Sequence, residues 1–136
     1  MRVAALVGPS GSGKTTLVVE LIRRFVTEGR TVGAIKHTHH PLTDVNRGDT
    51  AAFVAAGARP VILAGDREAV MYGDTARRIP YRSPSDLLAY FETEIVLIEG
   101  FKDFSGWQRV EIRRGMTVEE VVEALRRTES RPGRIR

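Results

Sequence analysis

The chain has 136 residues, of which 42% are hydrophobic, and it contains no cysteine. This length suits one domain, and the lack of cysteine excludes disulfides and thiolate metal sites. No apolar run approaches the roughly 20 residues that span a bilayer, and the first apolar run is too short for a signal peptide. The sequence therefore predicts a cytoplasmic protein without a membrane segment.

The net charge of +4 comes partly from arginines near the C-terminal end. Residues 130–136 show no periodicity, so we expect a flexible basic tail after a single domain of residues 1–129. A nucleic-acid-binding surface would interleave basic residues with exposed aromatic ones, and the sequence shows no such pattern. The charge therefore does not indicate a nucleic-acid partner.

Residues 8–15 read GPSGSGKT, the complete G-x-x-x-x-G-K-[ST] pattern of a phosphate-binding loop. The apolar run 3–7 before it predicts a strand, and apolar residues at every fourth position of 16–26 predict a helix after it. Strand, glycine loop and helix together predict a nucleoside triphosphate site, because loop amides and the helix N-terminus bind phosphates. The predicted binding residues are Gly8, Gly11, Ser12, Gly13, Lys14, Thr15 and Thr16.

Two side chains of this loop have specific expected roles. Lys14 is expected to reach the β- and γ-phosphates, and the hydroxyl of Thr15 is expected to ligate Mg²⁺. The alternative interpretation is a glycine-rich turn between strand and helix that binds no phosphate, but it gives Lys14 no interaction partner. The loop therefore implies Mg²⁺ as a cofactor of the bound nucleotide.

A phosphate loop needs a second strand that ends in a carboxylate directed at the ion or its water. The apolar run 95–98, followed by Glu99 and Gly100, is the best candidate. Glu99 is expected at the carboxyl edge of the sheet, where it would position Mg²⁺ or the attacking water. Gly100 would then let the backbone pass close to a phosphate. Asp44 and Asp49 compete for the role of metal ligand, and a plain surface glutamate is the alternative interpretation.

All three histidines of the chain, His37, His39 and His40, fall within four residues. They follow a β-branched run, 31–36, which predicts a second strand, and therefore should lie on the same rim as the phosphate loop. Three interpretations stay open. The cluster could line a site for an anionic substrate with Lys36 as the charged anchor, hold a transition metal, or form a solvated turn.

The remaining segments alternate between strand and helix patterns, which predicts one α/β domain with a mostly parallel sheet. Ser83 and Pro84 predict a helix start, and Thr117 with Glu120 forms a capping box for a final helix. Residues 109–113 alternate apolar and charged side chains, as a half-exposed or edge strand does. Further predicted elements are a short helix over 49–56 and two strands over 61–64 and 69–72, forming a hairpin or neighbouring strands.

Several motifs in this order resemble the MobB proteins of molybdopterin guanine dinucleotide synthesis. They are GPSGSGKTTL at 8–17, AIKHTHH at 34–40, the RGD-T run at 47–50, AGAR at 56–59 and VLIEGFK at 96–102. The pairing of K-H-x-H-H with E-G-F-K is far more specific than the phosphate loop alone. The chain therefore resembles this family over most of its length.

The resemblance implies a P-loop NTPase-like α/β protein that binds GTP and assists a partner, MobA, in joining GMP to the pterin of the molybdenum cofactor. It implies weak GTPase activity at most, an accessory role toward molybdopterin or its molybdoenzyme acceptor, and often a homodimer. Carried onto this sequence, Gly8 and residues 11–16 would hold the phosphates and Mg²⁺, while residues 36–40 would face the nucleotide or the pterin. The preference for GTP over ATP rests on this resemblance, because the [NT]-K-x-D guanine signature is absent.

Two other function classes are weighed against this one. A small phosphotransferase acting on a metabolite would need an arginine lid over the phosphates, for which the chain offers Arg67, Arg77, Arg78 and Arg82. These arginines are more simply interpreted as solvated positions around turns. A nucleic-acid-dependent ATPase is disfavoured by the small size and the missing aromatic platform.

Overall fold

A computed structural model describes residues 1–42 and 47–129 of the chain. No helix in these described ranges is both long and apolar enough to cross a membrane. The elements in chain order are β1 (Arg2–Val7), α1 (Lys14–Thr27), β2 (Val32–His37), α2 (Arg47–Ala56), β3 (Val61–Ala64), β4 (Glu68–Tyr72), β5 (Ala76–Pro80), η2 (Pro84–Tyr90), β6 (Ile95–Glu99), β7 (Gln108–Glu111) and α3 (Val118–Glu129).

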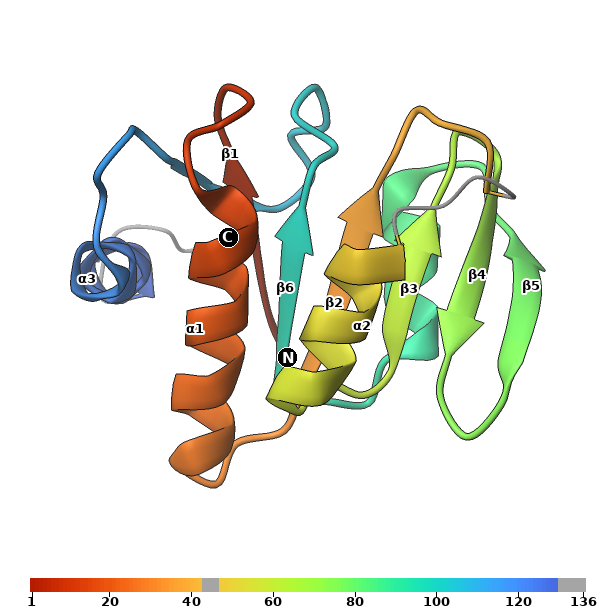
Figure 1. Ribbon diagram of the computed structural model, residues 1–136, viewed down its shortest axis with the longest axis horizontal. Coiled ribbons are helices and arrows are strands. Elements are labelled where there is room, and N and C mark those ends of the chain that lie inside the picture. Colours follow the sequence, from red (N-terminus) through yellow and green to blue (C-terminus); the bar gives the residue numbers. More distant parts are fainter. Residues whose placement is uncertain (43–46, 130–136) are drawn as a thin grey trace, which may run out of the picture.

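The strands form one seven-stranded sheet in the order β5-β4-β3-β2-β6-β1-β7. Pairs β1–β6, β1–β7, β2–β3 and β2–β6 are parallel, whereas β3–β4 and β4–β5 are antiparallel. The carboxyl ends of the parallel strands therefore meet at one edge, which is the upper edge in Figure 1. Loops after β1, β2 and β6 lie side by side there, at the position where open α/β sheets bind ligands.

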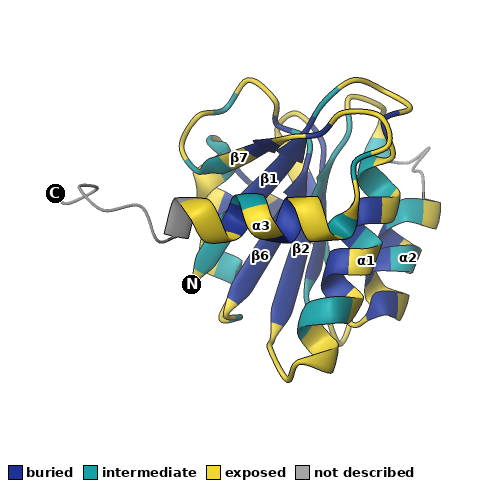
Figure 2. Ribbon diagram, turned by 90° about the vertical axis from the view of Figure 1, so that its left-hand side faces the viewer, coloured by how far each residue is buried: buried dark blue, intermediate teal, exposed yellow. Residues whose placement is uncertain are grey.

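Both faces of the central strands are covered, which explains their continuous apolar sequences. Alternate residues such as Leu6 and Leu97 face α1, α2 and α3 in one cluster of buried side chains. Their neighbours Val7 and Ile98 face the opposite side and pack with Leu87 of η2 in a second cluster. Figure 2 shows the buried strands running behind α3 and beside α1. The predicted α/β class with a mostly parallel sheet is confirmed.

The edges of the sheet differ most from the expectations. The run over 69–72 does form a hairpin with β3, but β5 continues the antiparallel part and was not expected from the sequence. The helix expected from Ser83 and Pro84 is a 3₁₀-helix, and Ser83 forms a capping box with Asp86 that was not predicted. Strand β7 is the predicted edge strand, beside β1.

Candidate functional site

The loop between β1 and α1 has a backbone that requires glycine at several positions. Gly11 and Gly13 have φ angles of 77° and 91°, in the left-handed region that residues with a Cβ seldom adopt. A Cβ on Gly8 would lie 2.5 Å from the carbonyl oxygen of Ile112, so the loop passes close to the end of strand β7. The chain therefore forms a compact loop directly at the N-terminus of α1.

This loop presents positive charge and polar groups at one place. The first turn of α1 carries no acidic side chain, so the positive end of the helix dipole is not neutralised locally. The ammonium of Lys14 lies 2.8 Å from the carbonyl oxygens of Gly8 and Pro9. The buried Oγ of Ser12 has no hydrogen-bond partner among the described residues. Each of these groups can interact with an anion bound in the loop.

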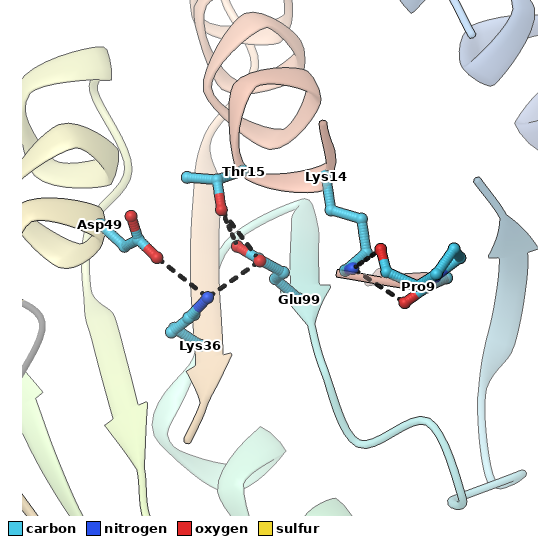
Figure 3. A network of polar contacts seen from close by, with 7 residues as sticks. Pro9, Lys14, Thr15, Lys36, Asp49 and Glu99 are labelled. Carbon is cyan, nitrogen blue, oxygen red and sulfur yellow. Dashed lines mark hydrogen bonds and ion pairs between the residues drawn. The ribbon is translucent and has the colours of Figure 1, made fainter. Parts of the chain in front are cut away.

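Glu99 is the centre of a polar network opposite Lys14, shown in Figure 3. The hydroxyl of Thr15 lies 2.9 Å from each carboxylate oxygen of Glu99. The ammonium of Lys36 lies 2.9 Å from Oε2 of Glu99 and 2.9 Å from Oδ2 of Asp49. The predicted acidic strand end thus lies beside the phosphate loop, and two carboxylates share one lysine.

Strand register places these groups together. Lys36 and Glu99 are directly paired residues at the carboxyl ends of the parallel strands β2 and β6, so their side chains start side by side. Asp49 reaches Lys36 from the first turn of α2. Burial lowers the pKa of Lys36, but its hydrogen bonds to Glu99 and Asp49 outweigh that effect and raise the pKa above its ordinary value. Lys36 is therefore a permanent cation at neutral pH, which leaves the trio with one net negative charge.

A cleft of about 490 Å³ opens in front of the network. It extends from the phosphate loop, across the strand ends, to the segment that follows β6. Its volume is in the range of small-molecule sites. The residues lining it include Gly8, Lys14, Lys36, His37, His39, Glu99 and the run from Gly100 to Phe104. Predicted site residues from the phosphate loop, the end of β2 and the end of β6 therefore line one cleft.

The other end of this cleft is formed by histidines. His37 ends β2, and its ring stacks on Phe101 with centroids 4.0 Å apart and planes 8° from parallel. Its Nε2 lies 3.4 Å from Oδ1 of Asp66, and Nδ1 of His39 lies 3.2 Å from the same oxygen. Burial, followed by repulsion from His39, lowers the pKa of His37. Hydrogen bonding to His39, reinforced by His37, lowers the pKa of Asp66.

Gly100 connects the two ends of the cleft. It follows Glu99 directly, its φ is 112°, and a Cβ placed on it would lie 2.7 Å from Cβ of His37. The next residue, Phe101, also has a positive φ, of 53°, and turns its ring onto His37. The sequence predicted a close approach of Gly100 to a phosphate. The close approach that the structure shows is to His37.

The predicted residues do not all enter this arrangement. His40 is exposed, and its backbone N–H donates to Oγ1 of Thr38 at 3.1 Å. Asp49 contacts Lys36, and Asp44 lies outside the described residues. Asp66 was not predicted as a site residue. Its place after β3, next to the strand that precedes the histidines, is the signal that could have found it.

The four arginines considered for a lid are not gathered at the loop. Arg77 and Arg78 lie in β5, not around a turn as expected, and β5 is separated from β1 by four strands. Arg78 forms an ion pair with Glu68 at 2.7 Å, and Arg77 lies over the ring of Tyr90. The cations that line the described part of the cleft are lysines: Lys14, Lys36 and Lys102.

Comparison with known proteins gives a consistent result. Residues 3–129 match the family model of MobB, described as molybdopterin guanine dinucleotide synthesis protein B. The molybdopterin-guanine dinucleotide biosynthesis adapter protein of Haemophilus influenzae is 35% identical over 98 residues, which are 71% of this chain and 55% of that protein. A putative adapter protein of the same description from Methanocaldococcus jannaschii is 33% identical over 104 residues, 76% of this chain and 42% of that protein. The chain thus spans about half the length of these relatives.

Solved structures support the same assignment. The crystal structure of a MobB homologue from Bacillus stearothermophilus has a TM-score of 0.51 and 26% identity, covering 93% of this chain and 71% of that one. A crystal structure of Bacillus subtilis MobB has a TM-score of 0.50 and 26% identity, covering 91% and 73%. The arrangement of sheet and helices is therefore shared with these proteins.

Proposed function

This chain belongs to the family of molybdopterin guanine dinucleotide synthesis protein B, and from this membership and its site we propose that it binds GTP as an accessory protein of molybdenum cofactor biosynthesis. The observation that carries the proposal is the junction of a complete phosphate loop with Glu99 through Thr15. The matched relatives are named adapter proteins, which supports an accessory role for this chain.

The phosphate loop is suited to a triphosphate. Its left-handed glycines direct backbone amides inward, α1 adds its unpaired N-terminal amides, and the buried hydroxyl of Ser12 has no partner among the described residues. The ammonium of Lys14 donates hydrogen bonds to two loop carbonyls. With a nucleotide bound, it would donate to phosphate oxygens instead, because charge-assisted hydrogen bonds are stronger than those to neutral acceptors. The proposed preference for guanine is supported by family membership alone.

The donor set around Thr15 suits Mg²⁺, which prefers oxygen ligands. The hydroxyl of Thr15 would ligate the ion directly, and Glu99 and Asp49 would bind it or its water molecules. When bound, the ion neutralises phosphate charge and fixes the phosphates in one geometry. Lys36 holds both carboxylates in place, so the chain supplies a net negative site without two unpaired acidic groups.

The same network favours slow hydrolysis. A general base must take a proton from water, but Glu99 accepts hydrogen bonds from Thr15 and is neutralised by Lys36. Efficient GTPases also use an arginine to stabilise the charge of the transition state. In the described part of the cleft the cations are lysines. We therefore assign nucleotide binding, rather than rapid turnover, to this site.

The proposed partner is a MobA-like guanylyltransferase, with molybdopterin or the molybdoenzyme acceptor as a further binding partner. In this scheme the chain holds a guanine nucleotide near the enzyme that consumes GTP. A homodimer is compatible with the family assignment and is part of the proposal. The partner surface is not assigned to residues.

The proposal is tested by a reconstituted guanylylation assay. Purified MobA-like enzyme, molybdopterin and limiting GTP are combined with and without this chain, and formation of molybdopterin guanine dinucleotide is followed. Wild-type chain is expected to increase product formation, and Lys14→Ala is expected to lose that effect while remaining folded. Equal product formation with wild type, variant and no chain would contradict the accessory role. Transfer of labelled γ-phosphate to a metabolite at a substantial rate would instead support a phosphotransferase.

A further inference from the structure

Three potential metal ligands converge at the histidine end of the cleft. Ring nitrogens of His37 and His39 and a carboxylate oxygen of Asp66 all lie within 4.8 Å of one another. Both nitrogens approach the same oxygen, Oδ1, at 3.4 Å and 3.2 Å. The three residues come from the end of β2, the segment after it and the turn after β3. Only the parallel pairing of β2 with β3 brings them together.

The spacing suits a four-coordinate transition-metal ion. Zinc binds imidazole nitrogen and carboxylate oxygen at about 2.0–2.1 Å in tetrahedral sites. Two ligands of such a tetrahedron are about 3.3 Å apart, because a tetrahedron's edge is about 1.6 times the distance from its centre to a corner. The distances from Oδ1 of Asp66 to the two nitrogens agree with that edge. The two nitrogens lie within 4.8 Å of each other, and the His39 side chain, which is 76% exposed, has room to rotate toward that edge length.

One ligand is rigid and the other two are adjustable. His37 is held by stacking on Phe101 and by the close approach of Gly100, and its side chain is 11% exposed. Asp66 lies in a turn closed by a hydrogen bond from Gly65 N–H to the carbonyl of Glu68. A fixed imidazole on a strand end, with two adjustable donors at hydrogen-bond distance, needs little rearrangement to enclose an ion.

We propose that His37, His39 and Asp66 form a binding site for a transition-metal ion of the Zn²⁺ or Co²⁺ type. Two imidazoles and a carboxylate suit such ions better than Mg²⁺, which prefers oxygen ligands alone. This site is separate from the Thr15–Glu99 network and goes beyond the proposed function. His37 and His39 line the cleft. The fourth coordination position therefore faces the cleft, where water or an anionic group of a bound molecule completes the tetrahedron.

The experiment is a titration of the chelator-treated, nucleotide-free chain with Co²⁺, followed by displacement with Zn²⁺. A four-coordinate Co²⁺ site gives intense visible absorption bands, whereas six-coordinate Co²⁺ gives weak ones. The expected result is one strongly absorbing Co²⁺ per chain, displaced by one equivalent of Zn²⁺. His39→Ala and Asp66→Ala, both changes at exposed positions, should weaken binding at least ~10-fold, the lower range for disturbed metal sites.

Two control variants make the result specific. His40→Ala removes an adjacent exposed histidine outside the trio and is expected to bind Co²⁺ as the wild type does. Lys14→Ala disables the phosphate loop and should also leave Co²⁺ binding unchanged, so failure of nucleotide binding and failure of this site are distinguishable. Weak six-coordinate binding, several ions per chain, or equal losses in His40→Ala and His39→Ala would overturn the proposal.

Discussion

The two ends of the cleft use acidic and basic side chains in opposite ways. At the phosphate-loop end, Glu99 is buried and shares Lys36 with Asp49, so part of the acidic charge is compensated within the protein. At the histidine end, Asp66 is 67% exposed, and its ion-pair partners among the described residues are two imidazoles, a group whose charge varies with pH. The first end resembles a fixed structural network. At the second end, His39 and Asp66 are exposed, so a change in their charge should cost the fold little.

The largest loss of stability should come from Gly100→Ala, because Gly100 lies against His37 between the two ends of the cleft. In Gly100→Ala the new methyl group meets Cβ of His37 at 2.7 Å, and the positive φ of 112° strains any residue with a Cβ. Strain and overlap together should lower the free energy of unfolding by about 2–4 kcal/mol, measured by urea denaturation.

Gly73→Ala is the matched control, because nothing lies within 4 Å of its added Cβ. A loss in Gly100→Ala no greater than in this control would show that the backbone of Gly100 can shift freely. The two ends of the cleft would then not be rigidly connected.

Removing the carboxylate charge at the phosphate-loop end is expected to have the next largest effect. Glu99→Gln keeps the shape of the side chain but leaves the partly buried Lys36 with Asp49 alone. The free energy of unfolding should fall by about 1–3 kcal/mol, somewhat less than for a fully broken buried pair. The double variant Glu99→Gln with Lys36→Met should be less destabilised than the two single losses added together. Strict additivity in this denaturation cycle would argue against the network.

Tyr81, a buried residue whose ring meets Phe101 edge-on, should make the stability of the fold sensitive to alkaline pH. Burial, with a smaller contribution from Asp66, raises the pKa of Tyr81 from 10.0 to about 12, and its hydroxyl donates to the carbonyl of Gly65. A raised pKa in the folded state stabilises the protein fully below pH 10, and this stabilisation is lost as pH rises from 10 to 12. At about pH 11 the loss is about 1.4 kcal/mol. Denaturation at about pH 8 and about pH 11 should show this component in wild type and not in Tyr81→Phe.

The smallest effect is expected from removing the carboxylate charge at the histidine end. Asp66→Asn, studied without added metal at about pH 7.5, should leave the free energy of unfolding nearly unchanged, because the side chain is exposed. A thermal unfolding scan beside Glu99→Gln gives the comparison directly. Equal destabilisation in both variants would remove the distinction between a buried, ion-paired end and an exposed end of the cleft.

Local patterns made much of the fold predictable. The glycine loop, the apolar run before Glu99 and the capping residues Ser83 and Thr117 each indicate an element through short-range chemistry. Strand β5 was missed because Arg77 and Arg78 are polar, and this edge strand is stabilised by pairing with β4 rather than by an apolar pattern. Apolar and polar residues alternate too weakly in the sequence of β5 to distinguish a strand from a turn.

Site residues were predictable from the sequence only where a single local motif identifies them. Lys14 and Thr15 follow from the loop sequence, and Glu99 follows from the apolar strand before it. The pairing of Lys36 with Glu99 depends on β2 lying beside β6, and the contact of Asp66 with His39 depends on β3 lying beside β2. Strand order is a property of the whole sheet, so residues brought together by it were not identified as partners. The roles assigned to the loop residues in binding remain predictions.

The most direct test is calorimetric titration of the chain with GTP in the presence of Mg²⁺, for the wild type and for Lys14→Ala. The account predicts a single saturable site in the wild type, weaker binding of ATP, and no measurable binding in Lys14→Ala at unchanged thermal stability. Equal millimolar binding of GTP and ATP, or GTP binding that survives in the variant, would contradict it.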